Sequence, residues 1–449
     1  MEPNKSLENT LATMNAMRND FLNSLVTIFP FEAIKEEYLN GTRDKVYNVE
    51  NTLLTMVYTA TQADKTLQNS VLSFKQIFES KRDTIIHQAE LVVEKEREID
   101  QQCTSPKLGR KKLYKTKIKK SALKDVSVNT AAYSKARSRI SLSLINDVYN
   151  TISKHPCNAE VWHGMGVYST DGTYIQMQDT PELWQKYPVK SQNKDASDHP
   201  YPQGLLQAII QHGSGFVYDY KLSNRQESEL NLIYDLIKNI PSNSVLLADD
   251  LYCSYNIFAL ARKNNFNMIV PGKRKRNYIV KEKIAEGDEI VEIEKTKCKK
   301  SKWCLEEASL PQNLLVRRIE FKSLDGKTPM VIYTTILDKS ISSTEIVLKY
   351  FNRWDIEITI REIKTLMDIN IIRSKTDDMV HKELAIALIA YNLIKKIIMQ
   401  STEGTAFSPK SDIIQRFFES NKKLFIDSKG RVYNRWSSGR YGKTNEKYN

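Results

Sequence analysis

Apolar residues recur at helical spacing in the first part of the chain, which has 449 residues in all. Residues 42–105 contain neither glycine nor proline, so nothing in their composition interrupts a helix. Two apolar sets in this range repeat every three or four positions: Leu53, Met56, Val57 and Ala60, then Leu67, Val71 and Phe74. The pattern predicts a helical N-terminal domain over residues 1–105.

From residue 161 onward the apolar residues form short runs separated by turn residues, a pattern typical of β-strands. Strands are expected over residues 167–177, 204–212, 215–222, 245–248, 267–270 and 330–337. Helical spacing instead predicts helices over residues 227–240, 255–264, 350–364 and 382–399. Three strands in hairpin succession, followed by alternating helix and strand, predict a mixed α/β sheet with helices on its faces.

Residues 274–328 interrupt this alternation. They are rich in lysine and glutamate and carry short alternating runs, Asp288–Ile293 and Leu314–Phe321, which predict a β-rich insertion. The expected division is therefore a helical domain over 1–105, a basic arm and linker over 106–150, a mixed α/β domain over 151–400 and a basic tail over 401–449.

The formal net charge of +13 favours a polyanionic partner, with nucleic acid ahead of a membrane surface. No membrane span is expected, because the best apolar run, Leu384–Tyr391, is far shorter than the roughly 18 residues that a spanning helix needs. The N-terminus lacks a signal pattern, so a cytoplasmic location is expected. The five scattered cysteines have few histidines nearby and are expected to be free thiols.

A basic arm is expected between Lys107 and Lys124, where nine basic residues, Lys111 and Lys112 among them, occur without one acidic residue. A merely soluble linker is the alternative. So unbalanced a cluster is better explained as an arm that contacts DNA phosphates. Such contacts position a protein on DNA but do not read its sequence.

A helix over Tyr350–Lys364 would carry a polar stripe beside an apolar seam. At about 100° per residue, Tyr350, Arg353, Glu357 and Lys364 fall within about 60° of one another, with Arg361 at the edge. This stripe would be about 21 Å long, which suits several backbone phosphates. The alternative is a solvated face with a single Arg353–Glu357 ion pair. The seam that would dock the helix on a core consists of Ile356, Ile360, Ile363 and Met367.

Three carboxylates occupy positions that suit metal-dependent phosphodiester chemistry. Asp171 lies on the first expected strand, Asp249 follows the apolar strand 245–248, and Glu357 lies on the docked helix. Two Mg²⁺ ions can activate the nucleophile and stabilise the leaving oxygen, and Mg²⁺ prefers oxygen ligands. Each carboxylate alone has a simpler interpretation, as a hairpin turn, a helix cap or an ion pair. Their combination favours the metal site.

The residues around these carboxylates resemble the motifs of the fourth insertion-sequence family of bacterial transposases. The family signature Tyr-x2-Arg-x3-Glu-x6-Lys matches Tyr350–Lys364, and the runs Tyr168–Thr173 and Leu246–Tyr255 are similar to its two aspartate motifs. The run Asn129–Ile140, with Tyr133, Lys135, Arg137 and Arg139, is similar to a segment that precedes its catalytic domain. The resemblance covers about residues 127–400.

This resemblance implies a ribonuclease-H-like mixed-sheet catalytic domain with a β-rich insertion, preceded by a helical DNA-binding region. It also implies that Asp171, Asp249 and Glu357 are the catalytic residues and the ligands of two Mg²⁺ ions, for which Mn²⁺ can substitute. The chain departs from the family at Asp250, where arginine is usual. Either Asp249 or Asp250 could be the second ligand, and the match to the motif favours Asp249.

The implied function is a cut-and-paste transposase, nucleoid-associated in a bacterial cytoplasm, that acts as a homodimer on double-stranded DNA. It would bind the terminal inverted repeats of its element, cleave there through a hairpin intermediate and join the 3′ ends to target DNA. Trp303 could stack on a base flipped from the hairpin, or it could be the core of a small β module. The alternatives are a non-catalytic DNA-binding remnant and a structural basic protein. Residues expected to contact DNA are Tyr350, Arg353, Arg361, Lys364, Trp303, Lys111, Lys112 and Arg137.

Overall fold

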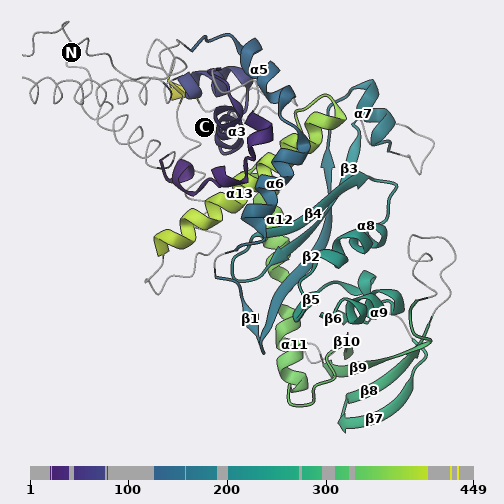
Figure 1. Cartoon of the computed structure of the whole chain (residues 1–449). Coiled ribbons are helices and arrows are strands. Elements are labelled where there is room, and N and C mark those ends of the chain that lie inside the picture. Colours follow the sequence, from purple (N-terminus) through teal and green to yellow (C-terminus); the bar gives the residue numbers. More distant parts are fainter. Residues whose placement is uncertain are drawn as a thin grey trace, which may run out of the picture.

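A computed structural model describes most of the chain between residues 21 and 402 (Figure 1). The described residues are 21, 23–39, 45–75, 78, 126–156, 158–189, 201–272, 276–295, 309–322 and 329–402, with two short strands at 425–426 and 432–433. The basic arm, with Lys111 and Lys112, and Trp303 lie outside these ranges.

One ten-stranded sheet runs through the protein, with its strands in the spatial order β4-β3-β2-β5-β6-β10-β9-β8-β7 and with β1 paired to β2. Strand β2 is antiparallel to β3 and parallel to β5, and β5 is parallel to β6. The bounds are β1 Val161–Trp162, β2 Met165–Gln176, β3 Gln203–Gln211, β4 Val217–Asn224, β5 Ser244–Leu247, β6 Asn267–Pro271, β7 Ile279–Ala285, β8 Asp288–Glu294, β9 Asn313–Lys322 and β10 Pro329–Thr334. The mixed α/β sheet expected from the sequence is therefore present, and its β4-to-β6 half fits a ribonuclease-H-like fold.

Strands β7, β8 and β9 fall in the range 274–328 and extend the same sheet beyond β10. They pair antiparallel in series, from β7 through β8 and β9 to β10. In Figure 1 this extension projects at the end of the molecule opposite the N-terminal helices. Apolar residues of the extension, among them Val291 and Val316, belong to the same buried cluster as Phe258 of helix α9, Tyr255–Lys263.

The helices of the sheet domain lie close to the positions that the sequence predicts. Helix α8 covers Glu229–Leu236 and continues as a short 3₁₀ turn, Ile237–Asn239. It begins at Glu229 because the Ser228 side chain caps the helix by accepting from the amide of Asn231. Helix α7 covers Pro181–Lys186, after a Thr180 cap.

The N-terminal helices are α3 Val49–Ala60, a helix over residues 67–75, α5 Thr130–Arg139 and α6 Leu142–Ser153. Helices α3 and α6 pack on the long helix α13, Asp377–Thr402, and α5 packs on α3. Buried residues of α3, such as Leu53 and Val57, belong to the same apolar cluster as Leu384 and Leu388 of α13. The same cluster includes Ile175 of β2 and Leu206 of β3, so the helical part of the chain and the sheet domain share one core.

Helix α13 begins five residues earlier than expected, at Asp377. Over Asp377–Ser401 it is long and apolar enough to cross a membrane by length and composition, and its most apolar 18-residue window has a mean hydropathy of 1.4. However, 72% of its most apolar window is buried inside the protein. Since α3 and α6 cover it, the apolar character is accounted for by core packing.

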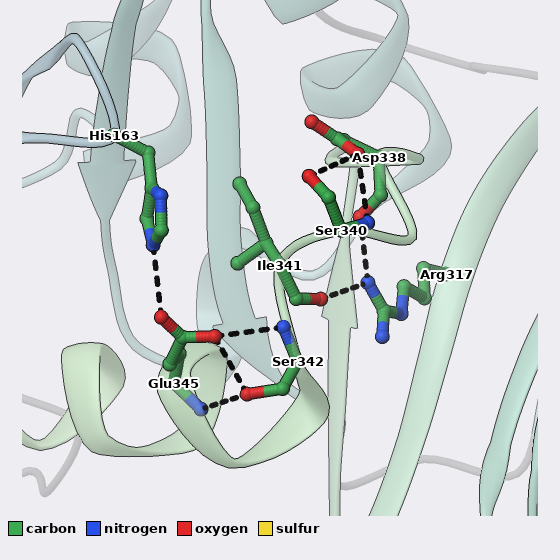
Figure 2. A network of polar contacts seen from close by, with 7 residues as sticks. All are labelled: His163, Arg317, Asp338, Ser340, Ile341, Ser342 and Glu345. Carbon is green, nitrogen blue, oxygen red and sulfur yellow. Dashed lines mark hydrogen bonds and ion pairs between the residues drawn. The ribbon is translucent and has the colours of Figure 1, made fainter.

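A hydrogen-bonded cap fixes the start of helix α11, Ser343–Phe351 (Figure 2). Ser342 and Glu345 form a capping box, in which each side chain accepts from the backbone amide of the other. The other carboxylate oxygen of Glu345 lies 3.1 Å from His163 Nε2, on the turn between β1 and β2. This contact ties α11 to the start of the central strand.

Arg317 of β9 is hydrogen-bonded to the backbone of the loop before α11 (Figure 2). Its Nη1 donates to the carbonyl oxygens of Asp338 and Ile341, at 3.0 and 2.8 Å. Its Nε and Nη2 donate to the Asp288 carboxylate at 2.8 and 2.5 Å, and both side chains are almost fully buried. The pair therefore connects the β7–β9 extension to the helix that precedes Glu357.

We predict that Arg317→Ala lowers the free energy of unfolding by about 3–5 kcal/mol, because it leaves the Asp288 carboxylate buried without its partner. Denaturant titration followed by circular dichroism would measure the change. The matched control is Lys339→Ala, which removes an exposed ion pair with Glu282 and should cost less than about 1 kcal/mol. Equal losses in the two variants would contradict the buried-pair interpretation.

Candidate active site

Asp171 and Asp249 lie at the same level of two neighbouring parallel strands. Ser169 of β2 pairs with Leu247 of β5, and each aspartate lies two residues further along its chain. Asp171 is still within β2, whereas Asp249 follows β5 and caps a 3₁₀ turn, Asp250–Tyr252, by accepting from Leu251 N at 2.9 Å. Carboxyl ends of adjacent parallel strands meet at one edge of a sheet, so these two carboxylates face a common region.

The two neighbouring aspartates, Asp249 and Asp250, share only part of their surroundings, since the charges of both add to the rise in the pKa of Tyr350 that burial causes. The charge of Asp249 also adds to the pKa rises that burial causes in Asp171, Glu229 and Tyr252. The charge of Asp250 raises the pKa of Cys253, a half-buried thiol for which burial is the larger cause. This difference favours Asp249 as the carboxylate that shares a site with Asp171.

Glu357 lies on helix α12, Trp354–Leu366, which packs against β2. The continuous helix expected over residues 350–364 is wrong at its start, because α11 ends at Phe351. Asn352 and Arg353 keep helical dihedrals, but their amides bond three residues back, to Lys349 and Tyr350, in a tighter turn. Tyr350 therefore belongs to α11 and the other signature residues to α12.

Three charged residues, Asp249, Arg353 and Glu357, lie close enough to Asp171 to affect its pKa. Burial raises the pKa of Asp171, and the carboxylates of Asp249 and Glu357 raise it further. The backbone amide of Gly172 and the guanidinium of Arg353 oppose this rise. The carboxylates of Asp249 and Glu357 are thus close enough to repel that of Asp171, a condition that a bound cation would relieve.

The basic and phenolic residues of the signature differ in exposure. Arg353 Nη2 donates to Glu357 Oε1 at 2.9 Å, so the predicted Arg353–Glu357 pair is present. Tyr350 is buried beside Arg353, and burial raises its pKa. Lys364 is half-buried near Thr173 of β2, and burial lowers its pKa. Arg361 is exposed.

The apolar seam of α12 contacts the core as expected. Ile356, Ile363 and Met367 are buried, whereas Ile360 is half-buried. Glu362, on the same helix, is a buried residue that was not predicted from the sequence. Its Oε2 accepts from Tyr391 Oη at 2.7 Å and lies 3.1 Å from Lys395 Nζ of α13.

Two further groups beside the carboxylates were not anticipated from the sequence. His212, after β3, lies 2.5 Å from Ser169 Oγ through Nε2 and 3.3 Å from Asp355 Oδ2 through Nδ1. The Nδ1 contact lacks hydrogen-bond geometry and is an ion pair only when the imidazole is protonated, so His212 lies between the strand of Asp171 and the helix of Glu357 and is hydrogen-bonded only to the strand. Glu229 of α8 accepts from Tyr252 Oη at 3.2 Å. Burial raises the pKa of Glu229, and the charges of Asp171 and Asp249 add to this rise. In the sequence Glu229 is only an acidic residue in the first turn of a helix, with no motif around it.

The chemistry of these donors fits a divalent, oxygen-preferring cation such as Mg²⁺. Asp171, Asp249 and Glu357 supply only carboxylate oxygens, from two strands and a packed helix. Within the described ranges, no three His, Cys, Asp or Glu side chains are placed so that they could ligate one ion together. The Glu357 carboxylate forms an ion pair with Arg353 instead, so it would have to leave that guanidinium in order to bind the ion.

Arg137 lies away from this group, on α5. Its guanidinium stands 5.8 Å from the ring centre of Tyr133 and lines a cavity of about 650 Å³ between the N-terminal helices and the start of α13. The structure does not bring Arg137 to the carboxylates, and Lys111, Lys112 and Trp303 fall outside the described ranges.

Two proteins of Escherichia coli (strain K12) are similar to the chain. Transposase InsG for insertion sequence element IS4 is 25% identical over 284 residues, 62% of this chain and 62% of the relative. Putative transposase InsZ is 26% identical over 106 residues, 24% of this chain and 35% of the relative. The chain thus matches less than two thirds of the length of each.

A solved structure, the cryo-EM piggyBac transposase synaptic complex with hairpin DNA, aligns with 62% of this chain and 55% of its own at 11% identity and a TM-score of 0.35. Residues 162–393 match the family described as Transposase DDE domain. This match covers more than half of the 449 residues and includes Asp171, Asp249 and Glu357. The chain therefore belongs to the transposase DDE domain family.

Proposed function

We propose that the protein is an active DNA transposase that cleaves the ends of its insertion sequence and joins them to target DNA. The observation that carries the proposal is the register of β2 and β5, which brings Asp171 and Asp249 to the same level of neighbouring strands, while Glu357 lies on the helix that packs against β2. A non-catalytic DNA-binding remnant is the alternative, but it gives no reason for two further carboxylates close enough to Asp171 to affect its pKa.

Family membership implies a divalent metal, and we propose two Mg²⁺ ions, with Mn²⁺ as a substitute, held by the three carboxylates. Bound there, the ions would supply an activated oxygen nucleophile and a stabilised leaving oxygen. The protein itself positions the DNA. Arg353, with Tyr350 at its side, and Lys364 supply donors for the phosphates next to the scissile bond, and exposed Arg361 extends this basic edge.

Double-stranded DNA is the proposed partner, in line with the net charge of +13. The basic arm with Lys111 and Lys112, and Arg137 of α5, would contribute phosphate contacts outside the catalytic edge. Both ends of an element must be cut together, so we propose a homodimer on paired ends, in the cytoplasm and associated with the nucleoid.

The route of second-strand cleavage is proposed to be a hairpin on the transposon end, formed when the freed 3′-OH attacks the opposite strand. Trp303 remains the predicted acceptor for the base that leaves the stack. The 3′ ends would then be joined to target DNA at the same carboxylates.

We predict that Asp171→Ala, Asp249→Ala and Glu357→Ala each reduce cleavage of an end-containing duplex in Mg²⁺ by more than about 100-fold. Groups that merely support metal ligands already contribute 10–100-fold, so the ligands themselves should contribute more. Binding of the duplex, measured by gel shift, should persist. Asp250→Ala is the matched control and should cleave normally; loss of cleavage in this variant alone would move the second ligand to Asp250.

We also predict that Arg353→Ala and Lys364→Ala reduce cleavage about tenfold or more, because each removes a charge-assisted phosphate contact near the scissile bond. The unfolding free energy should fall by no more than about 1 kcal/mol in Lys364→Ala, whose side chain is half-buried and has no ion pair with a described residue to lose. It should fall by about 1–3 kcal/mol in Arg353→Ala, whose side chain is 12% exposed and loses a charged hydrogen bond to Glu357. Lys339→Ala, an exposed lysine before α11, serves as the control in both assays. A large loss of stability with unchanged cleavage would favour a purely structural Arg353–Glu357 pair.

A further inference from the structure

The cavity of about 650 Å³ that Arg137 lines lies between the N-terminal helices and the segment that links α12 to α13. One wall comes from α3, the helix over residues 67–75 and α5, and the other from residues 367–376 and the first turns of α13. Met367, at the end of α12, belongs to the second wall. Met367 follows Glu357 by ten residues, so the cavity begins about 15 Å from Glu357 along the helix.

This cavity is lined by more basic than acidic side chains. The basic ones are Lys65, Arg137, Arg373 and Lys375, and the acidic ones are Asp368 and Glu383. Both acids already have donors. Asp368 Oδ2 accepts from Arg373 Nη2 at 2.8 Å, and the Glu383 carboxylate accepts from the backbone amides of residues 373 and 374 at 3.0 and 2.8 Å. In contrast, no described residue forms an ion pair with Arg137 or Lys375.

The guanidinium of Arg137 has a donor without an acceptor. Arg137 Nε is buried, and no described residue accepts a hydrogen bond from it. Its guanidinium stands 5.8 Å from the ring centre of Tyr133, which is only 1% exposed, so packing limits its movement. A buried donor without an acceptor is costly, and a planar guanidinium matches two oxygens of a phosphate. A rotation toward the cavity would offer Nε and one Nη to such a group.

The cavity lies beyond the basic side chains of α12. Lys364 precedes Met367 by three residues, and Lys65 Nζ donates to the Met367 carbonyl oxygen at the end of the helix. Each DNA strand carries one phosphate per about 3.4 Å of duplex axis, so about 15 Å corresponds to about four phosphates. A duplex that is cleaved at Glu357 and follows α12 would therefore bring a phosphate to the cavity about four positions from the cleaved bond.

We propose that this cavity is a phosphate-binding site, in which Arg137 of α5 and Lys375 before α13 hold one backbone phosphate of the DNA end. The inference rests on the proposed transposase function. Lys65 and Arg373 add positive charge, one from each wall. Since the walls belong to different parts of the chain, the bound phosphate would fix the N-terminal helices relative to the helix of Glu357. The competing explanation is that Arg137 only packs on Tyr133 and that the cavity holds water.

The test measures binding of an end-containing duplex to the full-length protein by gel shift, without divalent cations so that the DNA stays intact. In a series of duplexes, each phosphate of the terminal turn is replaced in turn by an uncharged methylphosphonate. The variants are Arg137→Gln and Lys375→Gln. The matched control is Arg139→Gln, an exposed arginine of the same helix that does not line the cavity. Inorganic phosphate, titrated during thermal denaturation of the DNA-free protein, tests for a free anion as the ligand.

We expect one neutralised phosphate, about four positions from the cleaved bond, to weaken binding by the parent about tenfold. Arg137→Gln should weaken binding of the unmodified duplex by a similar factor, and neutralising that phosphate should then cost little more, because both changes remove the same contact. Lys375→Gln should show a smaller loss that is coupled to the same position. Arg139→Gln should keep the full sensitivity of the parent to that phosphate.

If the loss from Arg137→Gln multiplies with the loss from every neutralised phosphate, Arg137 contacts none of them and the inference is wrong. Stabilisation by inorganic phosphate that Arg137→Gln abolishes, without any such coupling to DNA, would also overturn it by assigning the cavity to a free anion. A parent protein that does not prefer the end duplex to random DNA would instead contradict the proposed function. Should Arg137→Gln fail to fold, the coupling of the exposed Lys375→Gln decides.

Discussion

The buried ion pair between Glu362 and Lys395 holds helix α12 against α13, and the position of Glu357 depends on it. Burial lowers the pKa of Lys395, while the charge of Glu362 opposes this change. Tyr391 donates to the same carboxylate, so the pair is hydrogen-bonded as well as neutralised. Because Glu357 and Glu362 are five residues apart, they point about 140° away from each other around the helix. Fixing one side of α12 to α13 therefore directs the other side toward β2.

Polar side chains contact strand β2 from both faces of the sheet. On the α12 side, His212 lies between Ser169 of β2 and Asp355 in the first turn of α12, two residues before Glu357. On the α8 side, the run from Thr170 through Gln207 and Tyr252 leads to Glu229. The edge with Asp171 is thus supported by buried polar networks, and such networks define one geometry only if nearly all their members are satisfied. Among the described residues, one atom of each network has no hydrogen-bond partner, namely Gln207 Oε1 and His212 Nδ1.

Much of the sheet and the three carboxylates could be predicted from local patterns. The apolar run before Asp249 and the alternation around Asp171 are short-range signals, because side chains alternate within a strand and a buried strand is continuously apolar. The expected strands at these positions are present, as β2 and β5. The helix over 350–364 was only partly predictable, because the change from four-residue to three-residue hydrogen bonds at Asn352–Arg353 leaves the apolar spacing almost unaltered.

The sequence by itself therefore determined that the strand of Asp171, the strand before Asp249 and the helix of Glu357 form, in that order along the chain. Only the tertiary structure decided which other residues reach these carboxylates. Tyr252 meets Glu229 across 23 positions and Gln207 across 45, and Lys395 meets Glu362 across 33. A lone glutamate in a helix has the same local pattern whether it faces water, a lysine or an active site. Its surroundings are set by how the helices pack on the sheet, and that packing is not encoded in any short stretch of the chain.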